Sequence, residues 1–217
     1  MNPASAALRR LREGNRRFAA GASEMTGRAS AMRREEFLAA QSPFAVVLGC
    51  SDSRVPVEIV FDQGLGDLFV VRVAGNIAEL SQVESVEFAV ENLGTELVVV
   101  LGHSGCGAVQ AALEALRDPD PAGADRSSTI VEWIRPTLES LVGGGKQGAP
   151  EAVVSAAIRG NVRRTADRLR SGSDVLGRRV RAGSLRIVGA EYSMDTGVVD
   201  FFDDPTRSEE NRTKKKE

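Results

Sequence analysis

The stretch LVVVLGHSGCGAVQAAL (residues 97–113) joins an apolar run to a helical pattern through a glycine-rich turn. Valine and leucine fill residues 97–101 without alternating with polar residues, which is typical of a parallel strand buried on both faces. Alanine and leucine continue at helical spacing after the turn. A strand that passes directly into a helix predicts an α/β fold built on a parallel sheet.

The rest of the chain repeats this alternation. Apolar runs predict three further strands, at 43–50, 67–75 and 185–190, and helical patterns lie at 81–93, 106–116, 129–141 and 151–170. Residues 191–202 predict a turn that leads into an edge strand. We therefore expect a single α/β domain with a mostly parallel central sheet flanked by helices.

At the N-terminus, Leu8 and Leu11 are spaced as on one face of a helix among arginines. We expect a helical N-terminal arm within residues 1–40, which either lies on its own domain or embraces a partner subunit. The arm belongs to a domain of residues 1–202. Residues 203–217 are polar and are expected to form a disordered tail.

The 217 residues carry a net charge of −2, which gives no sign of a nucleic-acid partner. No apolar run approaches the length of about 18 residues that spans a membrane, and the arginine-rich start lacks the apolar core of a signal peptide. The two cysteines are too few for a disulfide framework. We therefore expect a cytoplasmic protein in a reducing compartment.

Two groups of chemically active residues fall at the carboxyl ends of predicted strands, where parallel sheets bind their ligands. CSDSR (50–54) follows the strand predicted at 43–50, and GHSGC (102–106) follows the strand that contains residues 97–101. If these strands are neighbours, Cys50, His103 and Cys106 converge. Two thiolates and one imidazole are a ligand set suited to Zn²⁺.

Three other interpretations of these residues are weaker. GHSGC resembles the G-x-S-x-G elbow of serine hydrolases, but position 106 is cysteine and the only histidine directly precedes Ser104. A redox pair of Cys50 and Cys106 lacks the C-x-x-C spacing and leaves His103 unexplained. The three residues could also be ordinary buried side chains, but their shared position at strand ends beside glycines disfavours this.

Together, CSDSR (50–54) and HSGC (103–106), separated by VFDQGLGDLFVVRVAGN (60–76), resemble the motifs of the β-class carbonic anhydrases. The resemblance extends from LREGNRRF near the N-terminus to GAEYSMDTGVVDFF before the tail. It implies a zinc ion in each chain, bound by the two cysteines and His103. It further implies reversible hydration of CO₂ to bicarbonate and a proton by zinc-bound hydroxide, in a homodimer or homotetramer.

The resemblance also implies roles for residues around the zinc. Asp52 and Arg54 match the family's catalytic pair. The substrate-pocket positions are matched by Gln41, Phe69, Phe88 and Gly105. Of these, Gln41 and Phe88 would reach a site across the dimer interface. Phe88 stands where many members have tyrosine, so a hydroxyl contribution is absent there.

Asp52 is expected to orient the attacking group while Arg54 keeps its carboxylate ionised through a bidentate pair. If Arg54 released it, Asp52 could become a fourth zinc ligand and close the site, and we expect the open form at alkaline pH. Family members regulated by bicarbonate use a Trp–Arg–Tyr trio. Arg72 and Tyr192 match this trio, but Val47 replaces the tryptophan, which argues against this regulation.

Two alternative functions stay open from the sequence. A related zinc hydrolase acting on COS or CS₂ could use the same ligands and the same Asp–Arg pair, since these molecules are linear like CO₂. A protein locked closed by Asp52 would bind zinc without catalysis. The motifs favour a carbonic anhydrase, which is a zinc lyase, over both.

Overall fold

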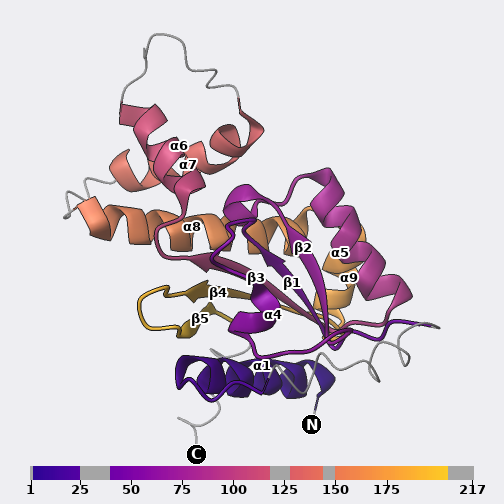
Figure 1. Ribbon diagram of the computed structural model, residues 1–217. Helices are drawn as coiled ribbons and strands as arrows, with labels where there is room; N and C mark the ends of the chain where they lie inside the picture. The colour runs from indigo at the N-terminus through magenta and orange to yellow at the C-terminus, as the bar shows by residue number, and fades with distance from the viewer. Residues whose placement is uncertain (1, 25–39, 118–127, 144–149, 205–217) are drawn as a thin grey trace, which may run out of the picture.

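The computed structural model describes residues 2–24, 40–117, 128–143 and 150–204 of the chain. Its centre is one five-stranded sheet with the strand order β2-β1-β3-β4-β5 (Figure 1). The strands are β1 (Ala45–Gly49), β2 (Leu68–Arg72), β3 (Leu97–His103), β4 (Arg186–Tyr192) and β5 (Val199–Asp203). Strands β1 to β4 are parallel and β5 pairs antiparallel with β4, which confirms the predicted fold class.

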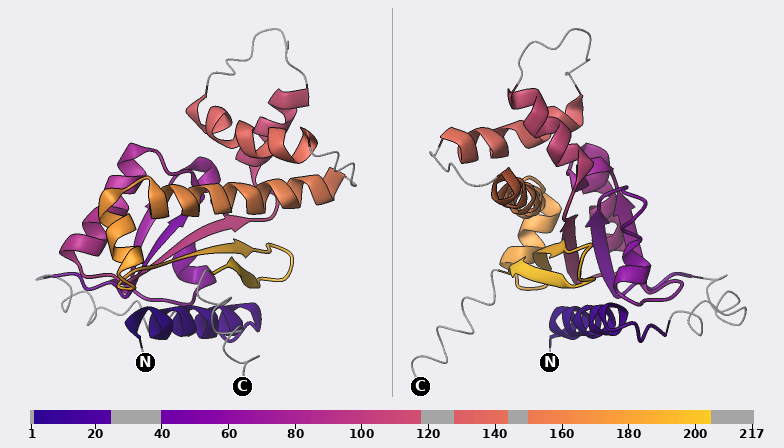
Figure 2. Two further views of the ribbon diagram at one scale, coloured as in Figure 1. Left: turned by 180° about the vertical axis from the view of Figure 1, so that it is seen from behind. Right: turned by 60° about the vertical axis from the view of Figure 1, so that its left-hand side comes forward.

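Helices cover both faces of this sheet (Figure 2). They are α1 (Pro3–Ala19), α4 (Val57–Val60), α5 (Leu80–Asn92), α6 (Gly107–Arg117), α7 (Thr129–Gly143), α8 (Pro150–Ser171) and α9 (Asp174–Arg181), with a short 3₁₀ helix, η1 (Ala74–Asn76). Helices α1 and α4 lie on one face, and α5, α8 and α9 on the other, while α6 and α7 pack against α8. Within the described residues, no helix is long and apolar enough to cross a membrane.

Strands β1 and β3 are buried along their whole length, which explains their unbroken apolar sequences. Alternate side chains of a strand point to opposite faces of the sheet. Val46 and Leu48 therefore pack on the side of α5 and α8, and Val47 packs on the side of α1. Because Gly49 pairs in register with Leu101, the residues that follow β1 lie beside the end of β3.

The sequence pattern does not reveal α4 and α9. Helix α4 is a single turn, which is too short to show a period. Helix α9 is rich in arginine, and Leu176 and Gly177 are its buried residues, so its apolar stripe is narrow. Its start is fixed by Ser173, whose Oγ accepts the backbone N–H of Leu176 at 3.0 Å.

Two residues that the sequence assigns to the polar tail belong to the folded domain. Strand β5 includes Asp203, and the carboxylate of Asp204 forms an ion pair with Arg186 on β4. Strand pairing and this ion pair therefore keep two residues of the expected tail in the domain. Residues 205–217 of that tail lie outside the described part of the chain.

Helix α1 lies along its own domain, on the face of the sheet that carries α4 (Figure 1). Asn15 fastens it there, because its Nδ2 donates to the backbone carbonyls of Val60 and Gly197. The Asn15 Oδ1 in turn accepts the N–H of Val199. Helix α1 thus packs on its own domain, which is one of the two arrangements expected for the arm, and contact of the arm with a partner subunit stays a prediction. Residues 25–39 of the expected arm lie outside the described residues.

At Gly14, α1 approaches the residue after α4 so closely that no side chain fits. A Cβ at this position would lie 1.9 Å from the carbonyl oxygen of Phe61. We predict that Gly14→Ala lowers the free energy of unfolding by about 1–3 kcal/mol, as overpacking does, although alanine alone would favour the helix by about 1 kcal/mol. Urea unfolding measures the change, with Glu13→Ala on the exposed side of α1 as the control. Equal stabilities of the two variants would contradict the docking of α1.

Candidate metal centre

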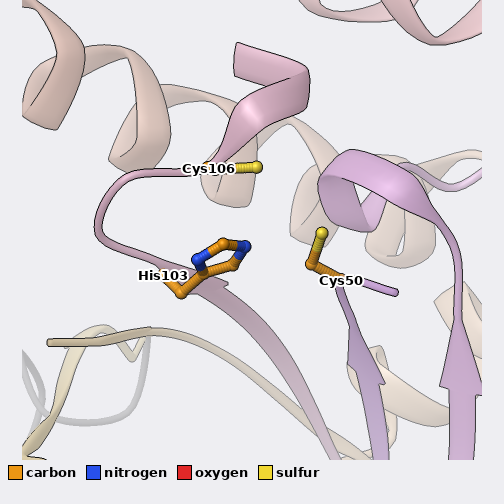
Figure 3. A group of neighbouring side chains, drawn as sticks. All are labelled: Cys50, His103 and Cys106. Atoms are coloured by element: carbon orange, nitrogen blue, oxygen red, sulfur yellow. The ribbon is translucent and has the colours of Figure 1, made fainter. Parts of the chain in front are cut away.

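Three potential metal ligands converge at the carboxyl edge of the sheet (Figure 3). Cys50 directly follows β1, His103 ends β3, and Cys106 precedes α6. One ligand atom from each, Sγ of a cysteine or a ring nitrogen of the histidine, lies within 4.8 Å of the others. All three residues are buried, with exposed fractions of 4%, 0% and 1%. The structure thus brings together the residues that the strand ends predict.

A tight turn from β3 to α6 delivers the two ligands of the HSGC motif. Gly105 has a φ of 64°, a left-handed conformation that favours glycine. The neighbouring Ser104 is tied to the residues around the end of β4: its N–H donates to the carbonyl of Tyr192, and its Oγ accepts the N–H of Met194 at 3.0 Å. The serine hydroxyl therefore fixes the turn, which is a structural role.

The ring of His103 is oriented for metal binding. Its Nδ1 lies 3.0 Å from the carbonyl oxygen of Ser104, which can only accept a hydrogen bond, so the proton is assigned to Nδ1. Nε2 is then an acceptor, and it is buried without a hydrogen-bond partner among the described residues. A buried acceptor without a donor is costly unless a cation lies before it. The orphaned Nε2 therefore fits a metal ion at this site.

The thiols of Cys50 and Cys106 are electrostatically linked. The pKa of Cys50 is lowered, mainly because the Cys106 thiol donates to its sulfur, and the N–H of Gly75 donates to it as well at 3.3 Å. The pKa of Cys106 is raised, because Cys50 holds its proton and because the thiol is buried. A divalent cation that displaces this proton would be held by two thiolates.

Asn161, which belongs to no sequence motif, supports the Cys50 sulfur indirectly. It is buried on α8, and its Nδ2 donates to the carbonyl of Gly75 at 2.7 Å. The N–H of the same glycine points at the Cys50 sulfur. Hydrogen bonds beyond the ligands orient them and tune their basicity. The sequence offers one signal for this role: Asn161 is a polar residue on the same helical face as the apolar Ile158 and Leu169.

Asp52 lies beside the potential ligands and is held by Arg54. The Nε and Nη2 groups of Arg54 donate to the two carboxylate oxygens at 2.9 and 2.7 Å, and its backbone N–H donates to Oδ1 at 3.0 Å. These bonds hold the pKa of Asp52 well below its usual range. The carboxylate Oδ2 lies 3.9 Å from Nε2 of His103, so Asp52 faces the site while it stays paired with Arg54.

Arg72 fixes the loop that carries Cys50 and Asp52. Its Nε donates to the carbonyl of Cys50 at 3.1 Å, and its Nη2 donates to the carbonyl of Asp52 at 2.7 Å. This guanidinium therefore holds backbone groups of the loop. Val47 lies fully buried in β1 at the position where the bicarbonate-binding trio would need tryptophan. With Val47 there, the trio lacks its tryptophan, as the sequence indicates.

The expected pocket residues Phe69 and Phe88 contact each other across β2 and α5, with ring centroids 6.3 Å apart. Phe69 precedes Arg72 by three residues, which is about 10 Å along the strand from the end that faces the site. Phe88 is 48% exposed, and Gln41 is exposed as well. By contrast, the carbonyl of Gly105 accepts a hydrogen bond from Arg54 at 3.4 Å. Within one chain, the structure therefore joins Gly105 to the site and leaves the other three apart from it.

Comparisons with known proteins agree with one another. A family model described as Carbonic anhydrase matches residues 45–199. Carbonic anhydrase 2 of Mycobacterium tuberculosis is 43% identical over 193 residues, which cover 88% of this chain and 89% of that protein. The β-carbonic anhydrase CafA of Aspergillus fumigatus has a similar structure, with a TM-score of 0.70 at 25% identity over 85% of this chain and 90% of that one. A tetrameric β-carbonic anhydrase of Sordaria macrospora shares the fold, with a TM-score of 0.69 at 22% identity over 79% and 88% of the two chains.

Proposed function

The chain belongs to the β-carbonic anhydrase family of enzymes, and from this premise we propose that it catalyses the reversible hydration of CO₂ to bicarbonate and a proton. We assign a zinc ion to Cys50, His103 and Cys106. The observation that carries the proposal is the buried, unpartnered Nε2 of His103 beside two linked thiols. Imidazole and thiolate are ligands that zinc prefers, and three protein ligands leave a fourth position open.

Zinc supplies, when bound, the acidity that makes hydroxide available near neutral pH. Asp52 orients the attacking water, because an ionised carboxylate only accepts hydrogen bonds and so fixes where the water's proton points. Arg54 holds both carboxylate oxygens of Asp52 and keeps it ionised. Arg72 immobilises the loop between them. Groups positioned in advance lower a barrier because they need no rearrangement during the reaction.

We propose that a second copy of the chain completes the pocket, in a homodimer or homotetramer. Gln41 and Phe88 are exposed in the single chain, and Phe69 packs against Phe88 away from its own zinc ligands. This placement suits walls that are contributed to the partner's site. Phenylalanine rings are a suitable lining for a substrate as small and apolar as CO₂. The similar Sordaria macrospora enzymes are tetrameric.

We also propose a cytoplasmic location and a single zinc domain. Both cysteines are free thiols, and a reducing compartment preserves them as metal ligands. The net charge of −2 gives no electrostatic reason for a nucleic-acid partner. The domain spans residues 1–202 together with Asp203 and Asp204, and it includes the matched residues 45–199.

Metal analysis combined with stopped-flow CO₂ hydration at pH 7 and pH 9 tests this function. We expect about one zinc ion per chain and measurable hydration at both pH values, faster at pH 9. Zinc without hydration at either pH would overturn the proposal and identify a closed zinc-binding protein. Sulfide release from COS or CS₂ without CO₂ hydration would also overturn it, in favour of the related hydrolase.

A further inference from the structure

A cleft of about 900 Å³ lies between α7 and α8, and none of the residues that line it belongs to the metal centre. Helix α7 crosses α8 on the side away from the sheet (Figures 1 and 2). The helices touch where Gly160 meets Thr137, because a Cβ at Gly160 would lie 2.5 Å from the Thr137 methyl group. The cleft extends from this contact along α8 toward Ser171.

Four arginines on successive turns of α8 line the cleft: Arg159, Arg163, Arg164 and Arg168. Helical periodicity places them on one side of the helix. Asp167 is the one acidic residue that lines the cleft within the described part of the chain. The cleft is therefore a positively charged surface on a protein whose net charge is −2.

Among the described residues, three of these arginines have no carboxylate partner. Arg163, Arg164 and Arg168 form no ion pair within residues 2–24, 40–117, 128–143 and 150–204. Arg164 and Arg168 stand four residues apart, where like charges on a helix surface repel each other. A bound anion would relieve this repulsion.

Three acidic groups around α8 are engaged with other arginines. Asp167 pairs with Arg170 at 2.9 Å. Glu191 and Asp200 pair with Arg159 at 2.7 and 2.8 Å. These carboxylates therefore leave the charge of the other three arginines uncompensated.

The α7 side of the cleft adds polar groups and an aromatic wall. Thr137 and Ser140 line it with hydroxyl groups. Trp133 also lines it, and the guanidinium of Arg164 lies 5.1 Å from the centre of its ring. The indole Nε1 is buried and has no hydrogen-bond partner among the described residues. The wall thus holds Arg164 in place through a cation–π contact and leaves an unused N–H donor.

We propose that this cleft binds a small molecule that carries two or three linked phosphoryl groups. Arginine binds phosphate oxygens through two parallel N–H donors. Arg168 lies four or five residues beyond Arg164 and Arg163, which is about 6–7.5 Å along the helix axis. This span exceeds a single phosphate and matches a short phosphate chain. A monovalent anion such as bicarbonate would engage one arginine and leave the others unpaired.

The protein's single tryptophan, Trp133, reports on the cleft directly. With the full-length, zinc-loaded protein at low ionic strength, we expect inorganic triphosphate to change its fluorescence in a saturable way. Triphosphate should bind at least about tenfold more tightly than inorganic phosphate, because it engages more than one arginine. Zinc content is measured after each titration, since phosphates also chelate zinc. Calorimetry with adenosine triphosphate then tests which part of a ligand is recognised. Equal affinity for adenosine triphosphate and inorganic triphosphate indicates recognition of the phosphate chain alone. Tighter binding of adenosine triphosphate indicates recognition of a nucleotide.

The triple variant Arg163→Gln, Arg164→Gln, Arg168→Gln should weaken triphosphate binding by about tenfold or more while CO₂ hydration stays unchanged. The matched control is Arg178→Gln, Arg179→Gln, Arg181→Gln, which removes the same charge from α9. Thermal unfolding checks that both variants are folded. An absent or unsaturable fluorescence change would overturn the proposal. Equal weakening in the α9 variant would overturn it too, since it would reveal a general effect of charge.

Discussion

Cys106→Ser is expected to abolish zinc binding and CO₂ hydration together. A serine hydroxyl has nearly the shape of the thiol, but it does not ionise at neutral pH and so supplies no anionic ligand. Cys50 and His103 would remain, with one thiolate in place of two to neutralise the divalent cation. We expect zinc to fall from about one ion per chain to near zero after treatment with a chelator. Hydration should fall to the uncatalysed background.

Elemental analysis and stopped-flow hydration on the same preparation measure both effects. Ser104→Ala is the matched control, because it changes a neighbour in the same turn. It loses the hydrogen bond from the N–H of Met194, which costs about 0.5–1.5 kcal/mol of stability, and it should keep zinc and activity. A Cys106 variant that retains its zinc would contradict the ligand assignment. An inactive Ser104 variant with full zinc content would revive the serine as a nucleophile.

The strands are the part of the fold that the sequence predicts best. Burial on both faces forces an unbroken apolar sequence in β1 and β3, so the run itself identifies them. Helices α4 and α9 escape prediction because one turn has no period and because α9 buries few residues. The position of α1 depends on bonds from Asn15 to Val60 and Gly197, which are distant in the chain. No local pattern encodes such a contact.

The ligand group is predictable for a topological reason, whereas the hydrogen bonds by which Asn161 and Arg72 support it are not. Parallel strands that lie side by side bring their carboxyl ends together, so Cys50, His103 and Cys106 converge once β1 and β3 are neighbours. Asn161 and Arg72 act on backbone carbonyls. Because every residue has a carbonyl, such bonds leave no motif in the sequence. The roles of Gln41 and Phe88 stay predictions, since their proposed neighbours belong to a second copy.

Arg54→Gln is expected to keep zinc but to lose most of its hydration activity at pH 7. Glutamine cannot donate to both oxygens of Asp52 as the guanidinium does. A zinc ion held by Cys50, His103 and Cys106 would then accept the freed carboxylate as a fourth ligand. We expect a fall in activity on the order of 100-fold at pH 7. Part of this loss should be recovered at pH 9, where hydroxide competes with the carboxylate.

Protonation of Asp52 does not explain such a pH profile. Arg54 lowers the pKa of Asp52, so removal of the arginine lets this pKa rise toward the usual value of about 4. That value still lies well below pH 7, and Asp52 therefore stays ionised in the variant from pH 7 to pH 9. A change in activity between pH 7 and pH 9 would therefore report competition between hydroxide and the Asp52 carboxylate for the fourth ligand position of zinc.

Asp52→Asn separates the two roles of this carboxylate. A neutral amide is a poor zinc ligand, so the variant cannot close the site, yet it also lacks the charge that orients the attacking water. We expect zinc to be retained and activity to fall by a similar factor at pH 7 and pH 9. Stopped-flow assays give, for each variant, the ratio of its hydration activity at pH 9 to its activity at pH 7. Arg178→Gln on α9 is the control for lost charge. If Arg54→Gln showed no higher ratio than Asp52→Asn, closure by Asp52 would be excluded, and Arg54 would act by positioning the carboxylate alone.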